Sequence, residues 1–308
     1  MKKYPLVSIV IPTHNRKDKL IRLIDSILRS NYPNDKLEII VVDDASTDGT
    51  YEEITKRYGD LIDKKILKII RTEKEVLLAG ARNLGIKNSK GKYIFLIDDD
   101  NVVDKDVIRL LVEFMEKYPE VGVVAPLMLY YDEPDRIWCA GIRRNYITSL
   151  TTFLYKDKKA NEIKEEIIES EDFPNAFMVK RDVFEKVGLF NNKDFPIHYD
   201  EGDFCARARK AGYKVVCYTK AKVWHDVRRS KVTGFETEWR TYYTARNRII
   251  FHKKYTKKYQ FLFFIFFFNW LITLYYIKLI LFDLEKPVRE KVTIVKAYLK
   301  GIIDGVIK

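Results

Sequence analysis

Three adjacent carboxylates end one of the most apolar stretches of the chain. The stretch "IFLIDDDN" (94–101) runs from four apolar residues into Asp98, Asp99 and Asp100. A hard divalent cation such as Mg²⁺ or Mn²⁺ prefers oxygen ligands, usually one or two carboxylates together with substrate phosphates. Alternate residues of an extended segment face the same side, so we expect Asp98 and Asp100 to share one ligand while Asp99 turns away. A simple turn or a helix cap accommodates three acids as well, and at this point both interpretations stay open.

A second acidic strand end lies earlier in the chain. The stretch "VVDDAST" (41–47) places Asp43 and Asp44 directly after an apolar run. A carboxylate at this position can accept hydrogen bonds from a nucleobase imide or a ribose. The alternative is a structural role next to a helix start, where Ser46 or Thr47 is the expected cap.

The elements that must position these acids alternate between strands and helices. Parallel strands covered by helices on both faces are expected from such a βαβα rhythm, and buried parallel strands read as continuous Val, Ile and Leu runs. In open α/β sheets of this kind, ligands bind at the carboxyl ends of the strands, where both acidic stretches lie. The predicted strands are 6–12, 37–42, 65–70, 92–97 and 121–126, and the predicted helices are 18–28, 50–58, 79–88 and 104–118.

The pattern is mixed from about residue 127 to 220. Residues 175–180 are predicted to form a strand and 181–188 a short helix. A further helix is predicted over 199–212, where Gly212 supplies a typical helix end, and a strand follows at 213–219.

Several of these stretches together resemble the family 2 glycosyltransferases, which have the GT-A fold. Their order and spacing match the family's successive motifs from residue 7 to about 225. After residue 120 the chain is most similar to the rhamnosyltransferase-type members. The matching stretches are "VSIVIPTHNR" (7–16), "VVDDASTDGT" (41–50), "AGARNLGI" (79–86), "IFLIDDDN" (94–101), "DEGDFCARARKAGY" (200–213) and "VWHD" (223–226).

The resemblance implies a role for individual residues. Asp100 is expected to ligate Mn²⁺ or Mg²⁺, with Asp98 contacting the ribose or the water shell of the metal. His225 lies where some members place a further metal ligand, although a lone His beside Trp is as often structural. The implied nucleotide-binding residues are Pro12, Thr13, Asp43, Asp44, Arg82 and Asp98, and the implied metal ligands are Asp100, Asp98 and His225.

The resemblance also implies a general base in the helix predicted at 199–212. The family's base is usually the second acid of a Glu-Asp pair, and the aligned residues here are Asp200 and Glu201. Glu therefore replaces the usual Asp, and Glu201 is the favoured base, with Asp203 and Asp200 as alternatives. Asp203 also precedes Arg207 by four residues, a spacing typical of an ion pair on one helix face.

The charge balance and the cysteines limit the class of partner. The formal net charge of +12 suits an anionic partner such as a nucleotide, a nucleic acid or a lipid head group, and a solvated Lys-rich surface is the simpler interpretation. The three cysteines show no C-x-x-C spacing, which fits a reducing cytosolic setting better than a disulfide framework or a zinc site. With the resemblance, we expect a nucleotide-sugar donor and no nucleic-acid partner.

The C-terminal part differs in kind from the rest. Residues 259–277 carry no charge and approach the length of about 20 residues that crosses a bilayer. The basic stretch 252–259 before them suits anionic lipid head groups and predicts the cytoplasmic face of the membrane. We expect the basic, amphipathic stretch 241–255 to rest on lipid. Because 283–308 is also Lys-rich, a spanning helix and an interfacial or re-entrant one both stay open.

The sequence thus predicts an inverting, metal-dependent glycosyltransferase of α/β class with a membrane-associated tail. The acceptor is expected to be a saccharide or a lipid-linked saccharide, and residues 127–176 are expected to select the substrates. The alternatives are a nucleotidyltransferase, for which no glycine-rich, lysine-bearing loop is present, and an inactive saccharide- or nucleotide-binding module. The predicted divisions are a GT-A domain at 1–225 with halves 1–126 and 127–225, a basic amphipathic connector at 226–258, and a membrane-associated tail at 259–308.

Overall fold

The computed structural model describes residues 4–227, 237–283 and 285–308, which form two compact units. We call them the sheet unit and the helical unit. The sheet unit comprises Met1–Arg143, Phe153–Phe190 and Phe204–Val227, and the helical unit comprises Arg144–Thr152, Asn191–Asp203 and Arg228–Lys308. The domain divisions expected from the sequence stay a prediction, and residues 228–236 of the predicted connector lie outside the described residues.

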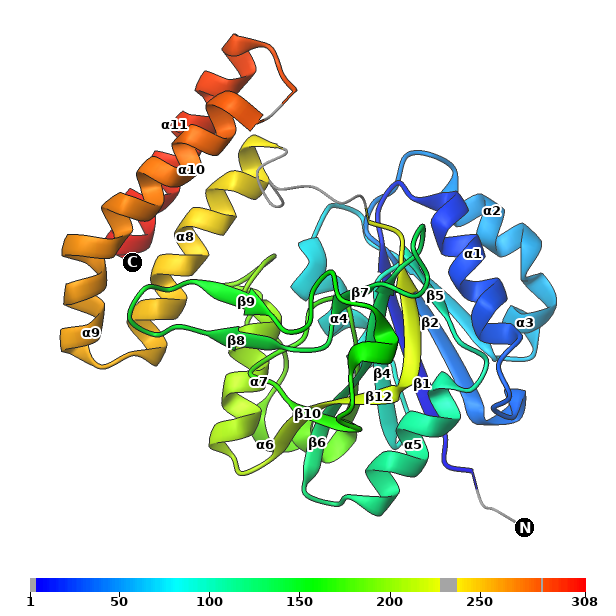
Figure 1. The fold of residues 1–308 in the computed structure, drawn as a ribbon. Helices are drawn as coiled ribbons and strands as arrows, with labels where there is room; N and C mark the ends of the chain where they lie inside the picture. Colours follow the sequence, from blue (N-terminus) through cyan, green and yellow to red (C-terminus); the bar gives the residue numbers. More distant parts are fainter. Residues whose placement is uncertain (1–3, 228–236, 284) are drawn as a thin grey trace. The chain divides into compact units, whose positions relative to one another are not determined.

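A ten-stranded sheet forms the centre of the sheet unit, in the order β10-β12-β6-β11-β4-β1-β2-β3, with β5 paired to β12 and β7 to β6 (Figure 1). Strands β4, β1, β2 and β3 are parallel, whereas β11 runs antiparallel between β4 and β6. The predicted, mostly parallel α/β sheet is thereby confirmed. The strands are β1 (Val7–Thr13), β2 (Leu37–Asp43), β3 (Leu67–Arg71), β4 (Tyr93–Ile97), β5 (Asn101–Val103), β6 (Val121–Tyr130), β7 (Ile137–Cys139), β10 (Ile167–Glu169), β11 (Ala176–Lys180) and β12 (Lys214–His225).

Helices flank this sheet close to where the apolar spacing predicts them. In α1, for example, Leu20, Leu23, Ile24 and Ile27 are all buried, because helical spacing brings them onto one face. The helices are α1 (Lys17–Leu28), α2 (Thr50–Arg57), α3 (Gly59–Asp63), α4 (Leu77–Lys87), α5 (Val107–Lys117), α6 (Arg181–Val187) and α7 (Asp200–Lys210), with short 3₁₀ turns η1 (Asn34–Lys36) and η2 (Ala160–Glu162).

The helical unit consists mainly of helices that lie side by side (Figure 1). Segments α9, η3 and α10 form one unbroken helix, Lys258–Phe282, and it is the one helix among the described residues that is long and apolar enough to cross a membrane. The elements are α8 (Glu238–Tyr255), α9 (Lys258–Phe263), the π-helical turn η3 (Phe264–Phe268), α10 (Asn269–Asp283) and α11 (Val288–Ile307), and a small sheet of β8 (Ile142–Arg144) and β9 (Thr151–Phe153) spans the boundary of the two units.

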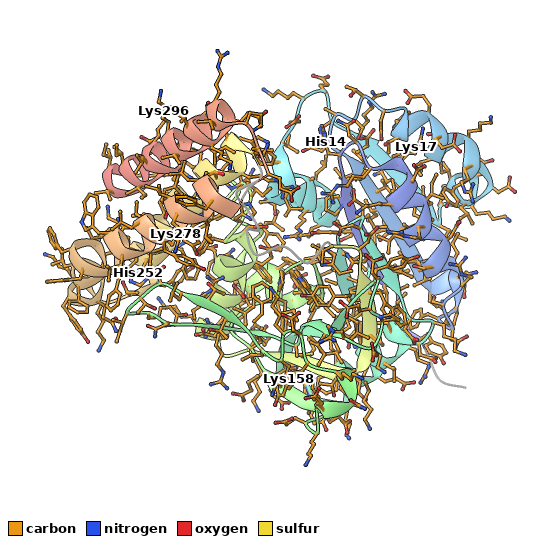
Figure 2. The ribbon with its side chains drawn as sticks, turned by 45° about the horizontal axis from the view of Figure 1, so that its top comes forward. His14, Lys17, Lys158, His252, Lys278 and Lys296 are labelled. Atoms are coloured by element: carbon orange, nitrogen blue, oxygen red, sulfur yellow. The ribbon has the colours of Figure 1, made fainter. Side chains whose placement is uncertain are left out.

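Helix α8 is the buried centre of the helical unit. Every residue from Ala245 to His252 is buried, and Figure 2 labels His252 on this helix. The expectation that 241–255 rests on lipid is therefore wrong. Neighbouring segments of its own unit cover residues 245–252, so this stretch has no apolar face exposed to lipid.

Gly85 lets α4 approach the sheet closely. A Cβ atom at this position would lie 2.3 Å from Val10 Cγ1 and 3.3 Å from Val42 Cγ2. These two valines belong to β1 and β2, the strands whose ends carry candidate site residues, so the approach of α4 bears directly on the site.

We predict that Gly85→Ala lowers the free energy of unfolding by about 1–3 kcal/mol, because the added methyl overpacks this contact. Chemical denaturation of the full chain in mild detergent measures the change. Gly59→Ala is the matched control, since no atom lies within 4 Å of the added Cβ there. Equal stability of the two variants would contradict the predicted overpacking.

Candidate functional site

The acidic strand ends lie at one edge of the central sheet. Strands β1 and β2 pair in register, so that Thr13 stands opposite Asp43, and Asp43 stands opposite Arg71 of β3. Strand β4, the other neighbour of β1, ends at Ile97, directly before Asp98. Because the carboxyl ends of these parallel strands meet at one edge, this edge is the expected ligand-binding edge.

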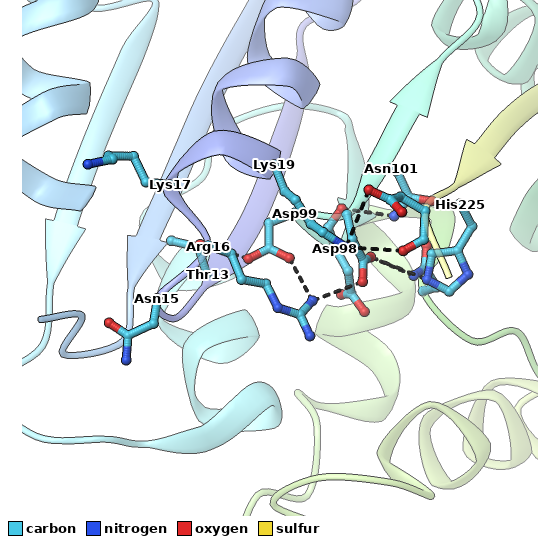
Figure 3. A network of polar contacts seen from close by, with 12 residues as sticks. Thr13, Asn15, Arg16, Lys17, Lys19, Asp98, Asp99, Asn101 and His225 are labelled. Carbon is cyan, nitrogen blue, oxygen red and sulfur yellow. Dashed lines mark hydrogen bonds and ion pairs between the residues drawn. The ribbon is translucent and has the colours of Figure 1, made fainter. Parts of the chain in front are cut away.

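Arg16 bridges two of the three adjacent acids. Its Nη1 atom lies 3.0 Å from Asp99 Oδ1 (Figure 3) and 2.8 Å from Asp100 Oδ2. Thr13 Oγ1 donates to Asp99 Oδ2 at 2.7 Å. Burial opposes the charge of Arg16, but the two carboxylates raise its pKa. Burial raises the pKa of Asp99 to about 7, although the positive charge of Arg16 acts in the opposite direction. The guanidinium thus supplies positive charge where the acids crowd.

This arrangement corrects the expected division of the three acids. Asp99 does not turn away from Asp100, since the two share Arg16. The reason is local: residues 99 and 100 form a turn between β4 and β5 rather than an extended segment, so alternate side chains do not share a side.

Asp98 is oriented by a buried arginine of α4. Arg82 is completely buried, and its Nη2 atom lies 2.9 Å from Asp98 Oδ1. The guanidinium carbon lies 5.9 Å from the ring centroid of Phe177 and 5.7 Å from that of Phe190. Arg82, which the resemblance places near the nucleotide, is therefore well suited to hold Asp98 in place.

Asp100 meets an imidazole from the far end of β12. His225 Nε2 lies 3.3 Å from Asp100 Oδ1, and Asn175 Nδ2 donates to the same oxygen at 3.3 Å. Burial disfavours the charge of Asp100, but His225 and then Arg16 hold its pKa below the usual range. The His225 ring also packs against Trp138, with centroids 4.2 Å apart. His225 thus has a packing contact and a carboxylate neighbour at once.

The pair of Asp100 and His225 fits a single divalent cation. With metal–ligand distances of about 2.1 Å, adjacent octahedral ligands lie about 3 Å apart, close to the 3.3 Å between these two atoms. His225 Nδ1 is buried and makes no hydrogen bond to any described residue. Among the described residues, no group of three or more His, Cys, Asp or Glu side chains forms a ready metal site. Water and substrate phosphates normally supply the remaining ligands of Mg²⁺.

Asp43 keeps one oxygen available at the sheet edge. Its Oδ1 atom accepts a hydrogen bond of 3.1 Å from the backbone N–H of Ser46. Its Oδ2 atom is buried and has no hydrogen-bond donor among the described residues, and Arg71 Nε lies 3.8 Å away. A buried carboxylate oxygen without a donor is costly, so this atom is suited to accept a hydrogen bond from a ligand.

Asp44, in contrast, accepts hydrogen bonds from the backbone of the chain. Its carboxylate accepts from the backbone N–H groups of Val76 at 2.8 Å and Leu77 at 2.9 Å, at the start of α4. The helix that follows Asp44 directly, α2, is served by Asp48, which accepts from the backbone N–H of Thr50 at 3.1 Å. The expected caps Ser46 and Thr47 do not have this role, because Gly49 intervenes before α2 begins.

The acids of α7 differ sharply in their surroundings. Asp200 and Asp203 are completely buried, whereas Glu201 is partly exposed. One oxygen of Asp203, Oδ1, lies 2.6 Å from Lys254 Nζ and accepts from the Tyr255 hydroxyl at 2.7 Å. Asp203 is thereby paired within the helical unit.

Helix α8 also holds the loop that leads into α7. Asn247 Nδ2 donates to the carbonyl of Ile197 at 2.8 Å, and Arg246 Nη1 donates to the carbonyl of Asp194 at 2.8 Å. In the same loop His198 and Tyr199 have φ values of 59° and 65°. Left-handed backbone is strained for such residues and persists where its surroundings hold it. The buried α8 supplies that support.

Comparison with protein families identifies the family of the chain. The model of "Glycosyl transferase family 2" matches residues 8–188, more than half of the chain. The chain belongs to this family. The matched span contains both acidic strand ends and α4, but not the acids of α7.

Two solved glycosyltransferases share the fold of this family 2 member. GalNAc-T7, solved with UDP, GalNAc and Mn²⁺, matches with a TM-score of 0.66 at 16% identity. The match covers 100% of this chain and 57% of the GalNAc-T7 chain. The mannosyltransferase PcManGT from Pyrobaculum calidifontis, solved with GDP-Man and Mn²⁺, has a TM-score of 0.59 at 15% identity over 99% and 88% of the two chains. These likenesses confirm the GT-A fold.

Relatives by sequence match over shorter spans. Glycosyltransferase GlyG of Streptococcus pneumoniae is 32% identical over 42% of this chain and 41% of its own. TuaG of Bacillus subtilis, which is named a putative teichuronic acid biosynthesis glycosyltransferase, is 35% identical over 36% of this chain and 42% of its own. The protein y4gI of Sinorhizobium fredii is 29% identical over 73% of this chain but only 25% of its own. The chain thus spans less than half the length of these three relatives.

Some residues of the candidate site were not predicted from the sequence. Arg16 is part of the first motif, but nothing in its spacing indicates that it bridges Asp99 and Asp100. Asn175 has a φ of 75° and donates to Asp100, a contact that depends on the antiparallel placement of β11. Arg71 ends β3 opposite Asp43. The only signal for Arg71 was its place at the end of a predicted strand.

We predict that Asp100→Asn removes most of the Mn²⁺ enhancement of nucleoside diphosphate binding. The amide keeps the shape of the side chain but loses the charge that favours a cation. Isothermal titration calorimetry with UDP and GDP, with and without Mn²⁺, measures the difference. Asp63→Asn, which changes an exposed acid on α3, is the matched control. Unchanged metal dependence in Asp100→Asn would remove this residue from the metal site.

We also predict that Arg16→Gln lowers the melting temperature more in EDTA than in Mn²⁺. Without the guanidinium, Asp99 and Asp100 repel each other, and a bound cation relieves part of that repulsion. Thermal unfolding in the two buffers gives the result, and Arg29→Gln, an exposed change at the end of α1, is the control. A metal-independent loss of stability would show that Arg16 acts only through packing.

Proposed function

We propose that this family 2 glycosyltransferase transfers a sugar from a nucleotide donor to a hydroxyl acceptor with inversion. The observation that carries the proposal is the cluster at the sheet edge, where Asp43 ends β2 and Asp98 and Asp100 follow β4, the two strands that flank β1. Arginines orient two of these acids, and the third, Asp43, keeps a buried oxygen without a hydrogen-bond donor among the described residues.

The donor's nucleoside is proposed to lie beside Asp43. Its Oδ2 atom accepts an N–H of the base, which relieves the cost of its burial. Pro12 and Thr13 end β1 next to Asp43, and they are proposed to line the nucleoside site with it. Asp98, held by Arg82, accepts from the ribose. The proposed part of Asp44 is indirect, because its carboxylate caps α4.

Asp100 and His225 are the proposed ligands of a divalent cation, Mn²⁺ or Mg²⁺. When bound, the cation supplies positive charge that stabilises the departing diphosphate. Asp98 is placed to contact the water shell of that cation. Arg16 adds a fixed positive charge beside the same acids.

Glu201 is the proposed general base. It takes the proton of the acceptor hydroxyl while the acceptor oxygen bonds to the anomeric carbon. The bond from that carbon to the diphosphate oxygen breaks on the opposite side, and the nucleoside diphosphate leaves with the electron pair. Asp203 is less suited because its carboxylate pairs with Lys254 and Tyr255, and Asp200 is completely buried.

The proposed acceptor is a saccharide carried on a membrane lipid. The support is the long apolar helix Lys258–Phe282 and the basic residues before it. We propose that the protein works on the cytoplasmic face of the membrane, in polysaccharide biosynthesis, and that its substrates resemble those of rhamnosyltransferase-type members. Residues 127–176 are proposed to select them.

A donor screen tests the proposal directly. The full chain in mild detergent is incubated with UDP-, GDP- and dTDP-sugars and Mn²⁺, and the release of nucleoside diphosphate is measured. A transferase releases some diphosphate by hydrolysis even without acceptor, and binding without any release would favour the alternative of a saccharide- or nucleotide-binding module. Nuclear magnetic resonance of the product then reports whether the anomeric configuration is inverted.

We predict that Glu201→Gln lowers kcat by about 10²-fold or more, because the amide cannot accept the proton. Donor affinity should change little. Asp203→Asn is the informative comparison: it loses the pairing with Lys254 and Tyr255, so stability falls and kcat is less affected at a temperature where the variant is folded. An active Glu201→Gln beside a folded, inactive Asp203→Asn would move the base to Asp203.

A further inference from the structure

An apolar stripe runs along one side of the helix Lys258–Phe282. The helix has 25 residues, yet only 28% of its most apolar stretch is buried. Phe266 and Leu274 are each 65% exposed. The exposed large apolar residues follow helical spacing: Tyr259, Leu262, Phe263, Phe266, Phe267, Trp270, Leu271, Leu274, Tyr275, Leu281 and Phe282. So long an exposed apolar stripe indicates a docking surface.

The other side of this helix is fixed to its own unit. Phe264, Asn269 and Ile272 are buried there. Arg248 of α8 donates to Asn269 Oδ1 at 3.0 Å and to the Tyr298 hydroxyl of α11 at 2.9 Å. One buried arginine thus joins three helices, and its separation from both partners would leave a buried charge without those hydrogen bonds.

Helix α11 is joined closely to α8 as well. A Cβ atom on Gly301 would lie 2.4 Å from the carbonyl oxygen of Tyr242, and one on Gly305 would lie 2.8 Å from that of Arg246. The Tyr242 hydroxyl also donates to Asp304 at 2.8 Å. The two helices therefore run in the same direction in direct backbone contact, so α11 does not separate from α8 without loss of this packing.

A crossing of the bilayer by α10 conflicts with these contacts. Helices α8 and α11 would have to enter the hydrocarbon with it, or the buried network of Arg248 would have to break. Charged side chains are costly at the bilayer centre, and α11 carries several of them. They are Arg289, Glu290, Lys291, Lys296, Lys300 and Asp304, and Figure 2 labels Lys296 on α11 and Lys278 on α10.

The composition of the stripe and its ends identifies the partner. Phe, Leu, Trp and Tyr dominate it, as in helices that lie in a membrane interface. Exposed lysines stand where the helix begins, at Lys253, Lys257 and Lys258, and suit anionic head groups. A second copy of the chain would cover the stripe without needing these charges.

We propose that Lys258–Phe282 lies in the plane of an anionic bilayer, with its exposed stripe in the lipid and α8 and α11 on the same side as the enzyme. The inference rests on the membrane attachment proposed above and specifies how the attached helix is oriented in the bilayer. A helix of 25 residues is about 37 Å long, so in-plane insertion spreads the contact along the surface. The protein enters one leaflet and does not cross.

Labelling of the full chain in native membranes tests the topology. Single cysteines replace Lys64 in the sheet unit and Lys296 on α11, both exposed, while the three native cysteines are buried. A membrane-impermeant maleimide is added to intact cells and to inside-out vesicles. In-plane insertion predicts that both cysteines react in the same preparation. Reaction of the Lys296→Cys and Lys64→Cys variants in opposite preparations means that the helix spans, and overturns the proposal.

A vesicle assay tests the surface itself. The double variant Phe266→Glu, Leu274→Glu should bind vesicles containing phosphatidylglycerol at least about tenfold less than wild type, because charges enter the lipid-facing stripe. Ile167→Glu, an exposed apolar position in the sheet unit, is the matched control and should bind normally. Unchanged binding of the double variant, or a change in oligomeric state in its place, overturns the proposal. Release of nucleoside diphosphate from donor, measured separately, tells failure of docking from failure of the transferase function.

Discussion

The sheet unit depends on the compensation of three carboxylates that crowd at the end of a buried strand. Like charges at this spacing repel strongly in a medium of low dielectric constant. The chain meets this constraint with three cationic or ionisable side chains from different elements: Arg82 orients Asp98, and Arg16 and His225 flank Asp100. Each acid thereby has a defined direction, which a binding site for a cation and a diphosphate requires.

Differences in surroundings also explain why acids that lie close together in sequence have different roles. Asp43 and Asp44 are adjacent in sequence, yet one keeps a buried oxygen without a donor among the described residues and the other caps α4. In α7, Asp203 pairs with Lys254 and accepts a hydrogen bond from Tyr255, whereas Glu201 is partly exposed. In each pair the surroundings, and not the residue type, decide which carboxylate is available for ligand or proton chemistry.

Helix α8 connects two tasks within the helical unit. Its Asn247 and Lys254 support the loop and the first turn that carry Glu201, while its Arg248 holds the apolar helix through Asn269. A basic helix that looks amphipathic in sequence is therefore a buried scaffold. The helix proposed to dock on lipid and the segment that carries the proposed base are thus both held by α8.

The sequence by itself determined the main strands and helices of the sheet unit, the α/β class and the acidic strand ends, because apolar periodicity and local spacing encode them; the short strands β5, β7 and β10 were not predicted. Only the tertiary structure decided the partners of those acids. The bridge of Arg16 and the contacts of His225 and Asn175 join residues about 75 to 125 positions apart. The burial of α8 was equally invisible, because its cover comes both from the helices that follow it and from the loop before α7. Such contacts depend on how elements pack, and no local pattern records that packing.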